Sequence, residues 1–270
     1  MHWTNTISRL VGRVADTPFP GPVQRVINAA YVGLAGVDLR EHAPLATYRT
    51  LNELFTRRLA QPRQFDPAAD ALIAPVDGQV QGFGRLHRET MVQVKGLEYS
   101  VRELLTDRAR HVENAIDGAY MSLYLSPRRY HGYHAPATLH VDRLIHVPGK
   151  LLPVNALFVN RVHVFAVNER VILEGRRMSG QRFWMVLVGA TNVGSMTIAF
   201  EPELHTNLGL REPRVYEYAG GRRVQKGEYL GTFRMGSSVL LVAETHEPAP
   251  SSLGITRVRF GDPLPWPPAS

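Results

Sequence analysis

The chain has 270 residues, of which 44% are hydrophobic and 20% charged, and it contains no cysteine. A chain of this size and composition can bury a substantial core, and the lack of cysteine excludes disulfides, thiolate catalysis and thiolate metal sites. The formal charge of +7 favours an anionic partner, such as nucleic acid, an anionic membrane surface or an acidic substrate, without choosing among them.

The first sixty residues are predicted to be helical. An amphipathic pattern at i, i+3, i+4 and i+7 is formed by Ile7, Leu10, Val11 and Val14. After the proline-rich breaker at 17–22 the pattern resumes over 23–34, and a third helix is expected over Thr47–Leu59. These helices could pack on the rest of the protein, or they could form a basic amphipathic segment that lies in a membrane interface.

Neither a signal peptide nor a membrane-spanning helix is expected near the N-terminus. Arg9, Arg13 and Asp16 interrupt any apolar core of a signal peptide. The longest uncharged apolar stretch there is Val26–Val37, which is too short because a spanning helix needs about 20 residues.

From Ala71 onward the sequence changes to short runs rich in β-branched and aromatic residues between turn signals, such as RVHVFAVNERVILEG, FWMVLVGATNVGSMTIAF and VLLVAE. One helix is expected to interrupt them, because Ser100 and Glu103 have capping-box spacing. Gly220-Gly221 and Lys226-Gly227 predict turns. The predicted fold is α+β: a helical, membrane-associating segment over 1–62, followed by a β-rich domain over 63–270 with mostly antiparallel short strands.

The first candidate for chemistry is Asp77, in the stretch Ala74-Pro75-Val76-Asp77-Gly78. Asp-Gly is a common turn pair that needs no chemical role. A carboxylate directly after an apolar run could also orient a catalytic base. Both interpretations stay open.

The second candidate is the histidine pair His131 and His134, in SPRRYHGYHAP. Histidines three apart converge only on a helical or turn-like backbone. A zinc site is disfavoured, because there is no HExxH pattern and no third ligand at a recognisable spacing. The pair could supply a general base together with an acid or a substrate contact, or both residues could be purely structural.

The third candidate is Ser237, in Met235-Gly236-Ser237-Ser238-Val239 between the β-like runs Tyr229–Phe233 and Val239–Ala243. The plain interpretation is a hairpin turn. The alternative is a nucleophilic serine beside the unshielded carbonyl of Gly236. Asp77, His134 and Ser237 supply the three residue types of a Ser-His-Asp triad, although the sequence does not show that they meet.

Two other functions were weighed against the residues. A Ser-His-Asp hydrolase that does not cleave itself is weakened because no G-x-S-x-G elbow surrounds Ser237. APVDGQV and VQKGEYLG resemble the half-motifs of biotinyl and lipoyl carrier domains, yet the corresponding hairpin tip offers Arg234-Met235-Gly236-Ser237 and no lysine. A non-catalytic carrier or lipid-binding β-sandwich therefore remains as an alternative.

Taken together, the motifs resemble the bacterial, membrane-associated, pyruvoyl-dependent phosphatidylserine decarboxylase family over nearly the whole chain. The resemblance rests on YRTLNELFTRRL, APVDGQV, QVKGLEYSVRELL, SPRRYHGYHAP, GKLLPVN, NERVIL, VGATNVGS and KGEYLGTFRMGSS, in that order. Two departures are visible. The self-cleavage motif, commonly Leu-Gly-Ser-Thr, is here Met235-Gly236-Ser237-Ser238, and Gly132 replaces the arginine of Tyr-His-Arg-x-His.

The resemblance implies a self-processing lyase. Cleavage would fall between Gly236 and Ser237, giving a β chain of residues 1–236 and an α chain of residues 237–270. Asp77, His134 and Ser237 match the maturation residues of the family, and His131 matches a histidine of the decarboxylation step. Ser237 would become a covalent pyruvoyl group, the cofactor that accepts electrons when phosphatidylserine loses carbon dioxide. No metal is implied.

The resemblance also implies partners and a location. The substrate would be phosphatidylserine and the product phosphatidylethanolamine, and the enzyme would be peripheral on the cytoplasmic side of the cell inner membrane. Its partners would be an anionic membrane surface and its own cleaved chains as a heterodimer, with a dimer of these possible, and no nucleic acid.

Overall fold

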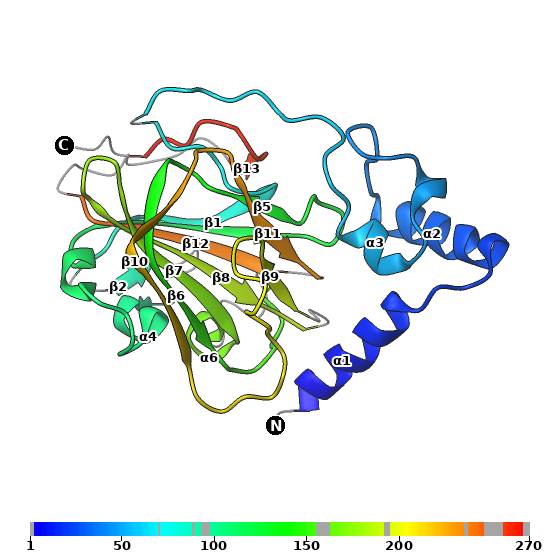
Figure 1. Cartoon of the computed structure of the whole chain (residues 1–270), viewed down its shortest axis with the longest axis horizontal. Helices are drawn as coiled ribbons and strands as arrows, with labels where there is room; N and C mark the ends of the chain where they lie inside the picture. Colours follow the sequence, from blue (N-terminus) through cyan, green and yellow to red (C-terminus); the bar gives the residue numbers. More distant parts are fainter. Residues whose placement is uncertain are drawn as a thin grey trace.

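The computed structural model describes residues 3–69, 71–87, 90–92, 98–154, 163–191, 195–234, 237–245 and 256–266. Within these ranges the helices lie mainly at the N-terminal end of the chain, and most of the remaining elements are strands (Figure 1). All of the strand pairings are antiparallel. The predicted α+β class with an antiparallel β-rich body is confirmed.

The helical elements are α1 Trp3–Asp16, α2 Gly21–Ala35, η1 Leu45–Thr47, α3 Leu51–Phe55, α4 Val101–Leu105, η2 Val112–Ala115 and α6 Val164–Val167. The strands are β1 Gly78–Arg85, β2 Thr90–Val92, β3 Glu98–Ser100, β4 Ala119–Leu125, β5 Gly132–His134, β6 Leu139–Val147, β7 Arg170–Arg177, β8 Arg182–Gly189, β9 Met196–Ile198, β10 Arg214–Val224, β11 Tyr229–Phe233, β12 Ser237–Ala243 and β13 Arg257–Val258.

An eight-stranded sheet forms the body, with strand order β10-β6-β7-β8-β12-β4-β1-β13. A three-stranded sheet, β5-β11-β9, and the pair β2-β3 complete the described sheets. β12 lies in the interior of the large sheet, between β8 and β4, and every one of its residues is buried. Burial on both faces explains why its sequence, Ser-Ser-Val-Leu-Leu-Val-Ala, is a continuous run rather than an alternating one.

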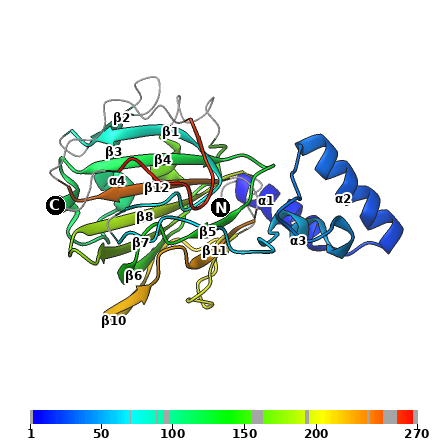
Figure 2. The same ribbon diagram turned by 90° about the horizontal axis from the view of Figure 1, so that it is seen from above.

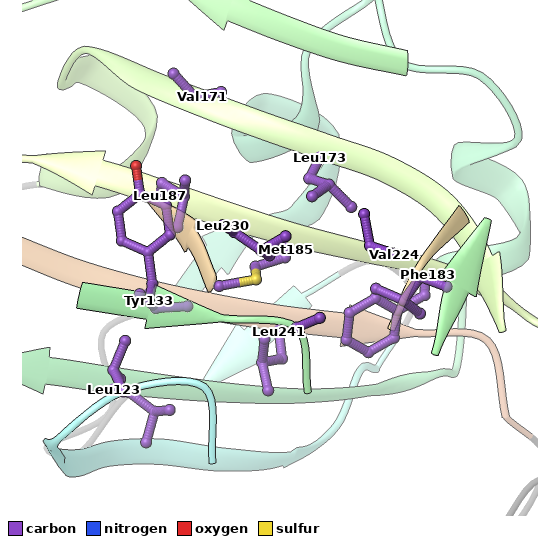
Figure 3. Close-up of a cluster of buried hydrophobic side chains, with 14 of the residues drawn as sticks. Leu123, Tyr133, Val171, Leu173, Phe183, Met185, Leu187, Val224, Leu230 and Leu241 are labelled. Atoms are coloured by element: carbon purple, nitrogen blue, oxygen red, sulfur yellow. The ribbon is translucent and has the colours of Figure 1, made fainter. Parts of the chain in front are cut away.

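The two faces of the large sheet bury separate hydrophobic clusters. One cluster joins the large sheet to the three-stranded sheet, and Figure 3 shows Tyr133 and Leu230 of the small sheet packed with Met185 and Leu187 of β8. The other cluster lies against β2, β3, α4, η2 and α6. Because side chains alternate along a strand, Val239 and Leu241 of β12 face the first cluster, and Ser237 shares their side.

Two local predictions about the last third of the chain are corrected. The runs on either side of Gly236 do not form a hairpin: β11 pairs with β5 and β9, whereas β12 pairs with β4 and β8. Ser237 and Ser238 are therefore strand residues. Gly220-Gly221 is not a turn between strands but lies inside β10, at a register shift against β6, and both glycines have φ of 80°.

The N-terminal helices stand at one end of the molecule, and α2 is the helix farthest from the β-rich body (Figure 2). The predicted third helix is shorter than expected and begins at Leu51, because Thr50 caps it by accepting a hydrogen bond from the Glu53 N–H at 3.0 Å. The capping box at Ser100 is confirmed, since its hydroxyl accepts from the Glu103 N–H at the start of α4.

The helices α1 and α2 bury their polar faces. Asn5 of α1 is buried and donates to the Gly149 carbonyl at 3.0 Å, while Leu10 and Val14 are 61% and 57% exposed. In α2 the buried residues are Gln24 and Asn28, which hydrogen-bond each other at 2.8 Å.

The apolar side chains of this region point into solvent instead. We define the apolar patch as Leu10, Val14, Phe19, Val23, Val26 and Leu34, which are all exposed. Leu34 reaches an exposed fraction of 91%. In the part of the chain that the structure describes, no helix is long and apolar enough to cross a membrane.

Candidate active site

Ser237 is the first residue of β12 and is fully buried in the structure. It lies opposite Leu125 of β4 on one side and Gly189 of β8 on the other. Its hydroxyl makes no hydrogen bond to any described residue. A buried hydroxyl without a partner is costly, and the neighbouring Ser238 and Ser122 share this feature. Gly236, the other residue of the predicted cleavage site, lies outside the described residues.

His134 is the last residue of β5, and its imidazole makes two hydrogen bonds and a stacking contact. Its Nδ1 lies 2.9 Å from the Gly227 carbonyl, which can only accept, so Nδ1 carries the proton. Its Nε2 then accepts from the hydroxyl of Tyr130 at 3.0 Å. The ring stacks on Phe260 with centroids 3.6 Å apart. Burial lowers the pKa of His134 to about 4, so the ring is neutral at neutral pH.

Asp77 does not contact His134. Its carboxylate pairs with Arg63, with Oδ1 2.5 Å from Nη1, and accepts the Phe260 N–H at 2.8 Å. The link to the histidine is indirect, since Phe260 is the residue whose ring stacks on His134. The backbones are also joined, because the His134 N–H donates to the Pro75 carbonyl at 2.9 Å. The Gly227 carbonyl, and not Asp77, sets the orientation of the imidazole in this structure.

His131 lies just before β5 in a separate environment. Its Nδ1 donates to the Arg129 carbonyl at 2.8 Å, and its ring packs on Phe55 of α3 with centroids 4.0 Å apart. Its Nε2 is buried and has no hydrogen-bond partner among the described residues. Burial, with the nearby charge of Arg57, lowers the pKa of His131 to about 3. The ring therefore holds an unprotonated Nε2 in a buried position, without a hydrogen-bond partner among the described residues.

Tyr130 and Gly132 form a matched pair beside His134. A Cβ at position 132 would overlap the hydroxyl and ring of Tyr130, the group that donates to His134. Any side chain at this position would push Tyr130 away from the imidazole. The absence of a side chain at Gly132 therefore leaves room for the Tyr130–His134 hydrogen bond.

None of the four predicted residues hydrogen-bonds to another of them. Ser237 lies four residues after Phe233, whose N–H donates to the His131 carbonyl at 3.1 Å. His134 lies opposite Tyr229 in the same small sheet. The extended backbone keeps His131 and His134 apart, so they do not form a joint ligand pair. Among the described residues no cluster could hold a metal ion.

Sequence reasoning missed several residues around this region. Arg63 neutralises Asp77, Phe260 carries the contact from Asp77 to His134, and Arg57 donates to the carbonyls of both Arg128 and Arg129. Tyr130 was visible, because it stands beside His131 in the histidine motif. The partners in 57–63 and at 260 had no local signal, because their contacts join segments far apart in the sequence.

Known proteins resemble this chain over almost its full length. The family model for phosphatidylserine decarboxylase matches residues 51–264. The chain is 37% identical over 264 residues to the phosphatidylserine decarboxylase proenzyme of Helicobacter pylori strain ATCC 700392 / 26695, covering 97% of this chain and 96% of that protein. It is 38% identical over 265 residues to the proenzyme of Anaeromyxobacter sp. strain K, covering 96% and 93%. The chain is thus an enzyme, a decarboxylase, and belongs to the phosphatidylserine decarboxylase family.

Proposed function

We propose that this enzyme decarboxylates phosphatidylserine to phosphatidylethanolamine and carbon dioxide, with a pyruvoyl group that it makes from its own Ser237. The substrate is taken from the name of the family and of the relatives, which are called proenzymes. The observation that supports the self-made group is the burial of Ser237 with an unpartnered hydroxyl.

A fully buried serine inside a sheet cannot meet an external ester, but it stands next to the carbonyl of the preceding residue in its own chain. This argues against a Ser-His-Asp hydrolase, whose nucleophile must be reachable by substrate. A non-catalytic carrier is disfavoured because the chain belongs to a family of decarboxylases.

Maturation would proceed on residues of the chain. The Ser237 hydroxyl attacks the Gly236 carbonyl as its proton passes to a base, and the acyl group moves from nitrogen to oxygen to give an ester. Removal of the Ser237 α-proton then expels the Gly236 carboxylate. The dehydroalanine that remains tautomerises and hydrolyses to a ketone, with loss of ammonia. The products are chains 1–236 and 237–270.

We assign the first proton transfer to His134 and the later protonation of the product to His131. His134 is neutral, with its tautomer fixed by Gly227. Its Nε2 is occupied by Tyr130, so the Tyr130 hydroxyl has to leave before Nε2 accepts another proton. Asp77, tied to Arg63, would act on His134 through space rather than by a direct bond, since its charge opposes the lowering of the His134 pKa.

The buried Ser237 fits the position of the pyruvoyl group, because its neighbours there are neutral and leave the side chain unbonded. When present, this group supplies an electron sink for the loss of carbon dioxide. His131, with its unpartnered Nε2, is suited to move a proton there.

We further propose that the apolar patch lies in the interface of an anionic membrane, on the cytoplasmic side of the inner membrane. Helices that bury polar faces and expose apolar ones gain free energy when a lipid phase covers those apolar side chains. The formal charge of +7 adds attraction to anionic lipid. The segment 1–62 would thus hold the body 63–270 against the membrane that contains the substrate.

The direct test is an assay of purified enzyme with short-chain phosphatidylserine, in which released carbon dioxide and phosphatidylethanolamine are measured. We expect one product of each kind per substrate and loss of activity after treatment with a carbonyl-directed reagent such as hydroxylamine. Release of free serine or fatty acid without carbon dioxide would favour hydrolysis and contradict the proposal.

A further inference from the structure

Three arginines line a cavity beside the site, and none of them forms an ion pair with a described carboxylate. The arginine cavity has a volume of about 330 Å³ and is lined mainly by Gln79, Tyr124, Ser126, Arg128, Arg129 and Arg257. Its described lining contains no aspartate or glutamate. Arg63 and Arg259 nearby both pair with Glu41, but Arg128, Arg129 and Arg257 form no ion pair with a described residue.

The charges in the cavity repel one another. Arg129 is half-buried, and its pKa is lowered by burial and then by the charge of Arg128; the charge of Asp77 opposes this, and Arg257 adds to the lowering. A bound anion would relieve this repulsion and accept hydrogen bonds from more than one guanidinium. Planar arginine donors suit the oxygens of phosphates and carboxylates.

The cavity adjoins the place where the chemistry is proposed. Tyr124 and Ser126 flank Leu125, and Leu125 is the residue of β4 that lies opposite Ser237. Because side chains alternate along a strand, Tyr124 shares the face of its partner Ser238, so the cavity approaches Ser237 along the strand ends and not across one face of the sheet. Paired strands place opposite Cα atoms about 5 Å apart, and the next residue along adds about 4 Å. The backbone that lines the cavity is therefore within about 10 Å of the Ser237 backbone by these spacings.

The loop that follows β4, which contains Arg128 and Arg129, is also connected to His131. Arg129 uses its carbonyl to orient His131, whereas its side chain lines the cavity. Arg57 is buried and fixes the loop by donating to the carbonyls of Arg128 and Arg129, at 2.9 Å each. The positions of the guanidinium groups are thus coupled to the histidine.

The cavity also adjoins the apolar patch. Ala35, the last residue of α2, lines it, and its neighbour Leu34 is the most exposed member of the patch. Tyr31 of the same helix donates to the Pro127 carbonyl at 2.9 Å, which fastens α2 to the arginine loop. An apolar surface next to a cationic cavity matches an amphiphile with an anionic head.

We propose that the arginine cavity binds the phosphodiester of the phospholipid headgroup. This inference rests on the proposed function and specifies how the substrate is held. The phosphate is the better candidate than the serine carboxylate, because arginines that stabilise the carboxylate would favour the ground state over the loss of carbon dioxide. With the phosphate anchored there, the amine and carboxylate would extend around the ends of β4 and β12 towards His131 and residue 237.

Binding can be measured apart from catalysis. In full-length Ser237→Ala protein, which cannot make the cofactor, calorimetric titration with glycerophosphoserine gives a dissociation constant for the headgroup without acyl chains. We expect Arg129→Gln and Arg257→Gln each to weaken this binding about tenfold. Arg257 lies on β13 and is exposed, so this variant tests the cavity even if Arg129→Gln fails to fold.

The matched control is Arg223→Gln, which removes the same charge from an exposed position on β10, at the opposite edge of the large sheet. It should bind like the parent protein. Equal affinity in the cavity variants and the control would overturn the proposal, because binding would then reflect net charge alone.

Two further ligands identify the group that is recognised. L-serine, which lacks the phosphate, should show no binding that depends on Arg129. Inorganic phosphate should bind no more tightly than glycerophosphoserine, with the same dependence on Arg129. If inorganic phosphate alone binds and glycerophosphoserine does not, the cavity is a site for free phosphate and the headgroup assignment is wrong.

The processed enzyme supplies an independent readout with monomeric short-chain phosphatidylserine. Arg257→Gln should raise KM about tenfold and change kcat by less than about threefold, because it removes binding that the ground and transition states share. A fall in kcat at unchanged KM would contradict a binding role. If wild-type enzyme releases no carbon dioxide, the proposed function fails, while the calorimetric result still decides whether the cavity binds the headgroup.

Discussion

At the centre of the large sheet, β12 is buried on both faces and leaves the hydroxyls of Ser237 and Ser238 without partners. In the N-terminal helices, outside the sheet, α1 and α2 bury asparagine and glutamine side chains and expose Leu10, Val26 and Leu34. Within the described residues, the core therefore holds hydroxyls without hydrogen-bond partners, and the surface holds apolar side chains that no described residue covers. Each arrangement costs stability, and each is explained by a different part of the proposed function: chemistry on the chain itself, and contact with lipid.

The comparison can be tested first within β12, where the largest effect is expected. Ser237→Ala should leave the chain intact and abolish activity, because no other hydroxyl is attached to the residue that follows Gly236. Ser238→Ala is the matched control, since it removes an equally buried and unpartnered hydroxyl that points to the other face of the sheet. Denaturing electrophoresis and the carbon dioxide assay report the two effects. Uncleaved chain in Ser238→Ala but not in Ser237→Ala would reverse our assignment.

The two histidines should separate the two reactions. His134→Gln should remain an uncleaved precursor, because the base for the Ser237 proton is lost. His131→Gln should be cleaved but should decarboxylate phosphatidylserine at least about 100-fold more slowly, the usual loss when a general acid is removed. The cleaved fraction and the rate per cleaved molecule are measured on the same samples. Efficient cleavage of the His134 variant would rule it out as the maturation base.

The surface half of the comparison is tested on α2. A Val26→Glu, Leu34→Glu double variant should bind anionic vesicles at least about tenfold more weakly, because it places charges in the apolar patch. Leu208→Glu is the control, since Leu208 is 55% exposed but lies outside the patch. Vesicle co-sedimentation at fixed salt measures both. Equal loss in the control would assign the effect to net charge.

The last test, which leaves activity and cleavage aside, is the pH dependence of stability. Burial lowers the pKa of His134 to about 4 in the folded chain from 6.5, so the unfolded chain binds the proton more readily. Stability should therefore fall as the pH drops from about 6.5 towards 4, by about 3 kcal/mol from this residue when the shift is fully expressed. Thermal melts of Ser237→Ala, with and without His134→Gln, isolate the contribution. An identical pH dependence in both would show that His134 titrates normally.

The sequence predicted the strands more reliably than their partners. The run Val-Leu-Leu-Val-Ala predicts a strand wherever it pairs, and β12 contains it. The hairpin between β11 and β12 was wrong because the flanking runs belong to different sheets, and pairing over long sequence separation leaves no local pattern. The serines were assigned to a turn for the same reason.

The site was predictable where its residues were unusual for their place. Ser237 and the histidine pair stand out in their segments, whereas Arg63 and Phe260 look ordinary and acquire their contacts to Asp77 only in the folded chain. For the helices, the sequence predicted the element but not its orientation. The apolar periodicity indicates an amphipathic helix, but whether the apolar face is buried or exposed depends on the rest of the molecule, and here the polar face is the buried one.

The central claim is that the enzyme converts its own Ser237 into its cofactor, and the intact mass of the denatured, purified wild-type protein tests it most directly. We predict two chains, 1–236 and 237–270, with the smaller chain lighter by one ammonia than simple hydrolysis of the Gly236–Ser237 bond would give. A single full-length species, or a smaller chain that begins with an unmodified serine, would contradict the account.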